Sequence, residues 1–284
     1  MRSRPPAYSA QFASDTLPVL RSIEPIDSVS ADWAWGGSTG NGIKVAVIDS
    51  GIDAEHPAVG GNIAGYVTIR EEDGQLRYDS APHGDLVGHG NACAGIIRAL
   101  APGCELYSVQ VLGASLTGRG SIFVAGLRWA LENNMQVCNL SLGTAKKEFF
   151  GVLHELTDLA YFRNVMLVTA ANNLPIPSFP SIYASVISVA AHEGHDPYQF
   201  FYNPQPPVEF GAPGIDVHVA WKSGEWLTAT GNSFAAPHLT GIVTKILAKH
   251  PDLTLFQMKA VLRALSANVV NAATLGGDSP LPGL

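Results

Sequence analysis

Cysteine is scarce in this sequence, with three residues in a chain of 284. That number excludes complete pairing, because one thiol is always left over. None of the three has the C-x-x-C spacing of a metal or redox site. We interpret Cys93, Cys104 and Cys138 as small buried apolar residues of a protein in a reducing compartment, and we predict a cytoplasmic location.

Long apolar runs and a basic surplus are also missing. No stretch approaches the roughly 18 consecutive apolar residues that a membrane span needs, so no membrane partner is expected. Arg2 and Arg4 are not followed by a continuous apolar stretch, so no secretory signal is predicted, unless a signal or pro-segment precedes the given sequence. The net charge of -7 offers no basic stripe to phosphate backbones, so nucleic acid is not an expected partner.

Apolar residues make up 46% of the chain and charged residues 14%, which indicates a compact globular protein. The length fits a single α/β domain. Residues 1–35 are polar and lack clear periodicity, so we interpret them as a leader on the surface. The domain is predicted to span residues 36–270, and residues 271–284 are expected to form a flexible tail.

Short apolar runs alternate with helical patterns along the predicted domain. The runs cover residues 43–49, 105–113, 135–143, 164–172 and 185–191. Continuous apolar strands are typical of a parallel sheet that crossover helices cover on both faces. The sequence therefore predicts a doubly wound, mostly parallel α/β sheet with helices on both faces, in which catalytic groups gather at the carboxyl ends of the strands.

Four polar residues lie where predicted strands end or helices begin: Asp49, His89, Asn173 and Ser233. Singly, each has an ordinary structural explanation, as a turn residue, a structural histidine or an N-cap serine. Together they supply an orienting acid, a base, an oxyanion donor and a nucleophile at one edge of a sheet, so we interpret them as a catalytic site. The α/β-hydrolase motif G-x-S-x-G does not apply, because Ala235 replaces its second glycine.

Over roughly residues 36–266 the sequence resembles the subtilisin-like serine proteases. The matching segments, in family order, are "VAVIDSGIDAEHP", "GHGNACAG", "YSVQVLG", "VCNLSLG", "VTAANN", "FPSIYASVISVAA", "FGAPG" and "TGNSFAAPH". The resemblance implies hydrolysis of peptide bonds, with Asp49, His89 and Ser233 as the triad, in the family's order. It also implies that Asn173 is the side-chain donor to the oxyanion.

The resemblance further implies that a peptide or protein substrate binds as an added β-strand. Two segments are expected to flank it, namely Ser141, Leu142 and Gly143 on one edge and Leu116, Thr117 and Gly118 on the other. Ala171 and Asn172 are expected in the wall of the pocket for the residue before the cut. No acid is expected in this pocket, so an apolar or uncharged residue is predicted there.

Three asparagines depart from the family pattern. Asn91 and Asn232 stand where relatives carry threonine, and Asn172 replaces a glycine of the pocket wall. The threonine before the serine assists the oxyanion hole in relatives, so Asn232 is predicted either to donate its own amide to the oxyanion or to weaken the site. Asn172 is expected to make the pocket narrower or more polar.

Two segments of many relatives are not expected in this protein. The chain after His89 is too short for the calcium loop that interrupts this helix, so neither a cofactor nor a strong calcium site is expected, and a weak cation site stays open. The long pro-segment of the family is not expected either, since only a short leader precedes the predicted domain. The chain therefore resembles intracellular and proteinase K-like members more than secreted subtilisins with a calcium loop, and the leader is expected to cross the active site near Leu17 and Pro18.

Other features leave alternatives open. Cys93 lies one helical turn after His89, and we interpret it as a core residue, with a functional thiol as the alternative. His192 and His195 lack H-E-x-x-H spacing and are interpreted as surface residues rather than metal ligands.

Two alternatives to a general endopeptidase stay open. One is an inactive peptide-binding module, which the three asparagines favour, and the other is a protease dedicated to one precursor peptide.

Overall fold

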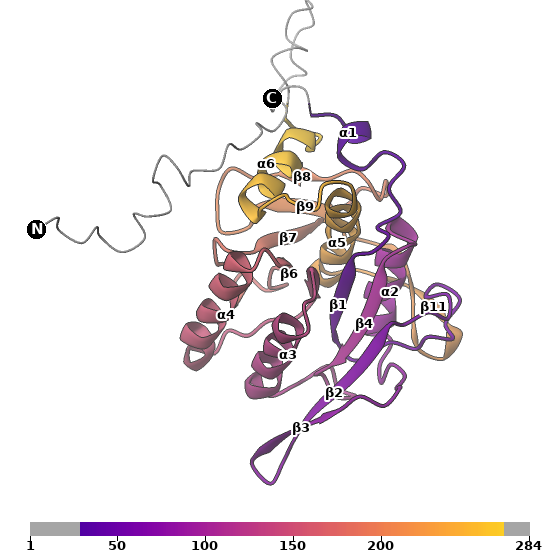
Figure 1. Cartoon of the computed structure of the whole chain (residues 1–284), viewed down its shortest axis with the longest axis vertical. Helices are drawn as coiled ribbons and strands as arrows, with labels where there is room; N and C mark the ends of the chain where they lie inside the picture. The colour runs from indigo at the N-terminus through magenta and orange to yellow at the C-terminus, as the bar shows by residue number, and fades with distance from the viewer. Residues whose placement is uncertain (1–28, 270–284) are drawn as a thin grey trace, which may run out of the picture.

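In the described part of the chain, residues 29–269, a nine-stranded sheet runs through the centre of the molecule (Figure 1). The structure is a computed structural model. The predicted tail and the Leu17-Pro18 pair lie outside the described residues. The strands of this sheet are β1 (Lys44–Asp49), β2 (Gly65–Glu72), β3 (Gln75–Asp79), β4 (Glu105–Gln110), β5 (Val137–Leu140), β6 (Met166–Ala170), β7 (Ile187–His192), β8 (Phe201–Tyr202) and β9 (Phe210–Pro213).

Across the sheet the strand order is β3-β2-β4-β1-β5-β6-β7-β9-β8. Neighbours from β2 to β9 pair in parallel, and the outer pairs β2–β3 and β8–β9 are antiparallel. The predicted doubly wound, mostly parallel sheet is therefore confirmed. Strand β1 has β4 on one side and β5 on the other, so the winding reverses there and a topological switch point lies at its carboxyl end.

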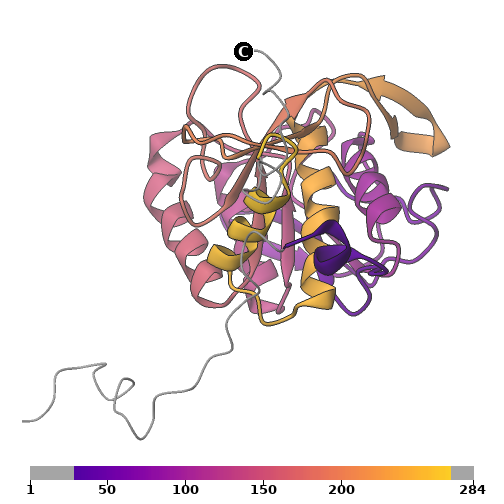
Figure 2. The same ribbon diagram turned by 90° about the horizontal axis from the view of Figure 1, so that it is seen from above.

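Helices cover both faces of this sheet (Figure 2). They are α1 (Ala31–Trp35), α2 (His89–Leu100), α3 (Gly120–Glu132), α4 (Phe150–Phe162), α5 (Asn232–Lys249) and α6 (Leu255–Leu265), with short 3₁₀ turns at Lys147–Phe149 and Lys222–Gly224. Helices α2, α5 and α6 pack on one face, and α3 and α4 on the other. A separate hairpin of β10 (Val217–Ala220) and β11 (Trp226–Ala229) lies beside α2.

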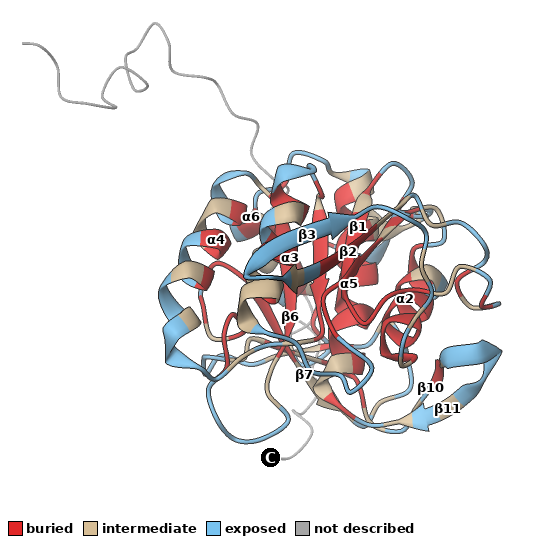
Figure 3. Ribbon diagram, turned by 90° about the horizontal axis from the view of Figure 1, so that it is seen from below, coloured by how far each residue is buried: buried red, intermediate tan, exposed pale blue. Residues whose placement is uncertain are grey.

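Strand β1 shows why the apolar runs form a sheet covered on both faces. Val45 and Val47 belong to the core beneath α2 and α5, whereas Ala46 and Ile48 belong to the core beneath α3 and α4. Because successive side chains of a strand point to opposite faces, a strand that is apolar at every position needs a cover on each. Figure 3 shows buried strands at the centre, with the buried faces of the helices turned towards them.

The packed domain begins before the predicted boundary at residue 36. Val29 and Ala34 are part of the core, and the Trp33 ring stacks on the His250 ring with centroids 4.0 Å apart. Lys249 Nζ donates to the Asp32 carbonyl at 2.6 Å. Residues 29–35 therefore belong to the domain, and a helix of five residues is too short to show a periodic pattern in the sequence.

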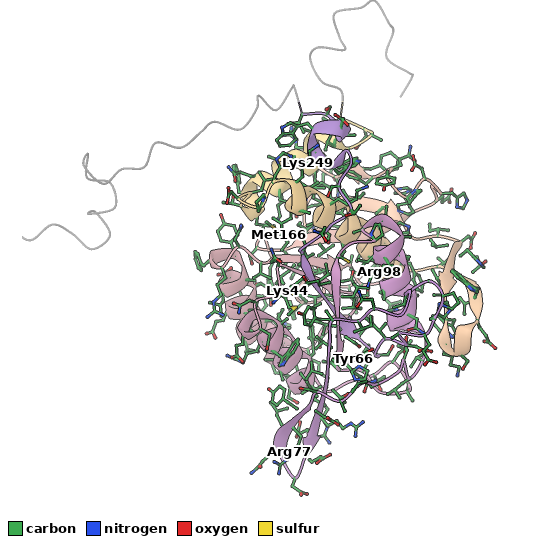
Figure 4. All side chains as sticks on the ribbon, turned by 45° about the vertical axis from the view of Figure 1, so that its right-hand side comes forward. Lys44, Tyr66, Arg77, Arg98, Met166 and Lys249 are labelled. Atoms are coloured by element: carbon green, nitrogen blue, oxygen red, sulfur yellow. The ribbon has the colours of Figure 1, made fainter. Side chains whose placement is uncertain are left out.

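Strands β2 and β3 form a hairpin that the sequence patterns did not reveal. At its turn, Asp73 and Gly74 have φ angles of 50° and 73°, the backbone that Asp-Gly favours in a two-residue hairpin turn. The hairpin projects from the body of the molecule, with Arg77 near its tip (Figure 4). Strand β3 is exposed throughout, so it lacks the apolar signal of the buried strands. None of the described helices is both long and apolar enough to span a membrane.

Candidate active site

Asp49 and His89 meet at the topological switch point. Asp49 is the fully buried last residue of β1, and His89 is the first residue of α2. The His89 ring donates from Nδ1 to the carboxylate, with Oδ1 at 2.8 Å and Oδ2 at 2.9 Å. The Ser50 N–H also donates to Oδ1, at 2.7 Å. The carboxylate thereby holds the imidazole in the tautomer whose Nε2 can accept a proton.

Glycines on both sides of His89 are required by close packing. Gly88 has a φ of 113°, and a Cβ at this position would lie 2.6 Å from the Trp221 ring. A Cβ at Gly90 would collide with the carbonyl oxygen of Gly51. The two glycines therefore allow Trp221 and Gly51 to approach the backbone beside His89.

A second carboxylate, Asp85, supports the start of α2. Its Oδ2 accepts the Asn91 N–H at 2.7 Å, and its Oδ1 accepts the Ser50 hydroxyl at 2.8 Å. Gly88, the N-cap, has no side chain, so Asp85 supplies an acceptor that the first turn lacks and an anion that the helix dipole favours. Asp85 was not among the predicted site residues, although an acid just before a helix start is a recognised signal.

The electrostatic surroundings of His89 favour its protonated form. Burial of the ring lowers its pKa, but the Asp49 carboxylate opposes this through its charge and its hydrogen bond, and the Asp85 charge adds to the opposition. The net result is that the pKa of His89 is raised above its ordinary value. An imidazolium formed during a reaction is therefore stabilised at this position.

Ser233 lies in the first turn of α5, and Pro237 follows inside the same helix. Proline has no N–H, so it cannot donate to the carbonyl four residues earlier, which is that of Ser233. This carbonyl instead accepts the Ser141 hydroxyl at 2.7 Å. The proline thus leaves the backbone of the serine free to bond to the segment that follows β5.

The Ser233 hydroxyl donates to the Ser141 carbonyl at 3.2 Å. Among the hydrogen bonds of residues 29–269, none joins this hydroxyl to His89, although both side chains line one cleft. Catalytic hydrogen bonds often form only when substrate is bound. The side chain of Ser233 must therefore turn before its proton can pass to His89.

Asn173 follows β6 and reaches the start of α5. Its Oδ1 accepts the N–H of Asn232 at 2.9 Å, which leaves its Nδ2 group as the donor for the cleft that Asn173 and Ser233 both line. The N–H of Ser233 is in the first helical turn and has no intrahelical acceptor. Two donors are thus available on one side of the cleft, where a negatively charged oxygen would be favoured.

Of the two alternatives predicted for Asn232, donation of its amide to the oxyanion does not agree with the structure, and a weakened site stays a prediction. Its Nδ2 group donates to the carbonyls of Ala171 at 3.2 Å and Asn172 at 3.0 Å, and its Oδ1 accepts the Ala191 N–H at 2.8 Å. Both amide protons are therefore engaged by backbone oxygens. The side chain of Asn232 joins α5 to the residues before Asn173 and to β7.

The cleft that holds His89 and Ser233 has a volume of about 660 Å³. Both predicted substrate edges line it, namely Ser141, Leu142 and Gly143 after β5 and Leu116, Thr117 and Gly118 after β4. Trp221 and Phe234 also line the cleft and were not predicted. The signal for Trp221 was weak, because an isolated tryptophan is more often part of a core.

A smaller pocket of about 160 Å³ adjoins Ser233. Ala171 and Asn172 line it together with Asn173, and none of the described residues that line it is acidic. The Asn172 side chain is turned back on its own loop, where its Oδ1 accepts the Leu174 N–H at 2.9 Å. Asn172 therefore contributes a polar wall to this pocket.

Cys93 lies beneath the site and is fully buried. Its thiol contacts Ser141 Oγ at 3.3 Å, the Ser233 carbonyl at 3.7 Å and Asp49 Oδ2 at 3.8 Å. Burial, followed by the charge of Asp49, raises the pKa of Cys93 well above its ordinary value. The thiol therefore stays protonated and packs between the segments that carry Asp49, Ser141 and Ser233.

Asp49, His89 and Cys93 form the one cluster of at least three metal-binding side chains among residues 29–269, with ligand atoms within 4.8 Å of one another. A metal ion there would have to replace the Asp49–His89 hydrogen bonds and remove a firmly held thiol proton. The donor set therefore fits a hydrogen-bonded pair of Asp49 and His89 better than a metal centre. His192 and His195 do not join such a cluster, and His192 Nδ1 accepts the Gly194 N–H at 2.8 Å within its own loop.

Comparisons with known proteins find similar sequences and similar folds. The model of the Subtilase family matches residues 40–277. Subtilisin E of Bacillus subtilis (strain 168) is 31% identical over 255 residues, which cover 84% of this chain and 64% of that protein. Subtilisin Savinase of Lederbergia lenta is 33% identical over 258 residues, which cover 87% of this chain and 89% of that protein.

Solved structures show the same fold. A cold adapted subtilisin-like serine proteinase superposes with a TM-score of 0.65 at 25% identity, over 80% of this chain and 83% of its own. The S41 Psychrophilic Protease superposes with a TM-score of 0.66 at 26% identity, over 79% of this chain and 82% of its own.

Proposed function

Because the chain belongs to the Subtilase family, we propose that it is a serine endopeptidase that hydrolyses peptide bonds in peptide or protein substrates. The observation that carries the proposal is the buried Asp49–His89 pair at the carboxyl end of β1, with Ser233 in the same cleft. A buried acid, a buried base and a half-buried serine at the ends of three different elements match the requirements of acyl transfer.

In the proposed reaction the Ser233 hydroxyl turns towards His89, gives its proton to Nε2 and attacks the scissile carbonyl carbon. His89 then returns the proton to the leaving amine, while Asp49 holds the ring and stabilises the imidazolium. The Nδ2 group of Asn173 and the N–H of Ser233 donate to the oxygen of the tetrahedral intermediate. A water molecule repeats the sequence on the acyl-enzyme and releases the second product.

We propose that the substrate lies as an extended strand between the two segments that line the cleft after β4 and β5. The residue before the cut would enter the pocket of about 160 Å³. The size of this pocket and its lack of acidic lining residues support an uncharged side chain of moderate size, whereas a basic side chain would need a buried carboxylate.

We also propose that the protein acts in a reducing compartment. Cys93, Cys104 and Cys138 are all buried as free thiols, and burial raises the pKa of Cys104 to about 11 and that of Cys138 to about 12. One relative, 31% identical over 269 residues, is named the Minor extracellular protease Epr of Bacillus subtilis (strain 168). Membership of the family therefore does not by itself imply a reducing compartment. Fractionation of the native cells would decide the matter.

The proposed activity is tested with a fluorophosphonate probe on the wild-type protein and on Ser233→Ala. We expect one equivalent of label on the wild type and none on the variant, because only an activated serine reacts. Both proteins must show the same far-UV circular dichroism. A folded wild-type protein that takes no label would reject the proposal and favour a peptide-binding module, and a peptide library would then measure binding instead of cleavage.

A further inference from the structure

Asn232 joins the two proposed oxyanion donors. Its N–H donates to Asn173 Oδ1 at 2.9 Å, and the next residue of α5 is Ser233. Its side chain donates to the carbonyls of the two residues that precede Asn173, at 3.2 Å to Ala171 and 3.0 Å to Asn172. One residue of α5 thus contacts three consecutive residues of the segment that carries Asn173.

The orientation of the Asn232 amide follows from its neighbours. The backbone N–H of Ala191 can only donate, so it must face Oδ1, which lies 2.8 Å away. The carbonyls of Ala171 and Asn172 can only accept, so they must face Nδ2. A threonine has a single hydroxyl proton and could donate to at most one of these carbonyls at a time.

We infer that Asn232 is a positioning residue of the oxyanion site, an inference that rests on the proposed function. Its side chain fastens residues 171 and 172, which directly precede Asn173, to the first turn of α5 and to β7, so that Asn173 Nδ2 and the Ser233 N–H keep a fixed separation. It does not donate to the oxyanion itself. Such donors work because they are in place before charge develops, and a displacement of about 1 Å can cost about 100-fold in rate.

The test is a double-mutant cycle on peptide hydrolysis, with Asn232→Ala, Asn173→Ala and both together. Asn203→Ala is the matched control. Asn203 also makes three side-chain hydrogen bonds to backbone, at 2.7 Å to the Gln205 carbonyl, 2.8 Å to the Val208 carbonyl and 3.0 Å from the Gln205 N–H. It lies between β8 and β9 and does not line the cleft.

We expect Asn232→Ala to lower kcat by about 10- to 100-fold with little change in KM, as for misplaced catalytic groups, and Asn203→Ala to leave kcat unchanged. In the Asn173→Ala background, Asn232→Ala should cost much less, because the group it positions is gone. An equal cost in both backgrounds, or a kcat for Asn232→Ala equal to that of Asn203→Ala, would overturn the inference.

Asn232→Thr provides a second variant in case the alanine variant does not fold. It keeps one hydroxyl, so we expect a change in kcat that is smaller in the Asn173→Ala background than in the wild type, and an equal change in both backgrounds would also overturn the inference. A wild-type protein that neither cleaves peptides nor reacts with the fluorophosphonate would overturn the proposed function and this inference with it. Normal labelling of the wild type with no effect of Asn232 variants would overturn the inference alone.

Discussion

Helix α2 carries His89 at its first position, and helix α5 carries Ser233 at its second. The N-cap residue of both helices is a glycine, so neither helix start is capped by a side chain of its N-cap residue. Each first turn also holds an asparagine that reaches away from the helix. Asn91 accepts the Asp53 N–H at 2.7 Å and donates to the Trp221 carbonyl at 3.2 Å. Asn232 instead binds the segment that carries Asn173.

The first turns of the two helices are therefore held in place by different kinds of interaction. The start of α2 is surrounded by charge, since Asp49 binds the ring of His89 and Asp85 binds the backbone behind it. The start of α5 is held by neutral hydrogen bonds to Ser141, Asn173 and the strand-end carbonyls. Perturbing α2 should change the dependence on pH, whereas perturbing α5 should change the geometry of the oxyanion site.

The largest losses of kcat are expected from substitution of Ser233 on α5 or of His89 on α2, and the two losses should be equal. Ser233→Ala and His89→Ala are each expected to lower kcat by about 10⁶-fold, the size known from subtilisin, and the double variant should be no worse than either alone, because base and nucleophile act as one unit. Single-turnover rates of peptide cleavage measure this. A loss for His89→Ala that is smaller by orders of magnitude would show that Ser233 does not depend on His89.

Asn173→Ala should have the next largest effect. Loss of a side-chain oxyanion donor costs about 10²- to 10³-fold in kcat, a range measured on subtilisin itself, with KM little changed. Steady-state kinetics on a chromogenic peptide give both constants. If KM rises and kcat does not fall, Asn173 contacts the substrate in the ground state and the oxyanion is held elsewhere.

Asn91→Ala should act on stability rather than on kcat. Asn91 is fully buried, and its removal leaves the Asp53 N–H and the Trp221 carbonyl without partners, so we expect about 1–3 kcal/mol less free energy of unfolding. Urea unfolding followed by fluorescence measures this. A fall in kcat as large as that of Asn232→Ala would remove the difference between the two asparagines.

The smallest expected effect is a shift of the pH profile. The raised pKa of His89 places the acid limb of kcat/KM above about pH 6.5, the ordinary value for histidine, because only the neutral ring accepts the serine proton. Asp85→Asn removes a charge that raises this pKa, so the limb should move to lower pH.

The raised pKa of His89 should also make the free energy of unfolding depend on pH. A raised pKa means that the folded state binds the proton more tightly, so the contribution of His89 to stability is full below about pH 6.5 and is lost as the pH rises through the folded-state pKa. His89→Ala should therefore remove this part of the pH dependence of the unfolding free energy.

For Asp85→Asn, an unchanged acid limb of the kcat/KM profile would show that Asp85 supports the helix backbone alone.

Much of this fold could be predicted because its central strands are buried on both faces. The apolar runs at residues 43–49 and 135–143 contain β1 and β5, and the polar residue that ends β1 is Asp49. The exposed β3 and the five-residue α1 carry no comparable pattern, so they were not foreseen.

The direction of a side chain could not be predicted either. The sequence places Asn232 beside Ser233, but whether its amide faces the cleft or the end of β6 depends on carbonyls that approach from residues about 60 positions away. Asp85 presents the same difficulty, because its partner Ser50 follows β1 whereas its partner Asn91 lies in α2. Position follows from local pattern, whereas contact follows from the packing of distant segments.

Pro237 affects the stage of folding at which the backbone around Ser233 gains its hydrogen bonds. It removes the local bond that would close the helix at Ser233, and the replacement comes from Ser141, 92 residues away in the sequence. A bond of that span forms only after β5 and α5 have docked, so an isolated or half-folded α5 holds the serine without its support. In a chain that is still folding, the proposed nucleophile therefore lacks this hydrogen bond until the sheet around it is complete.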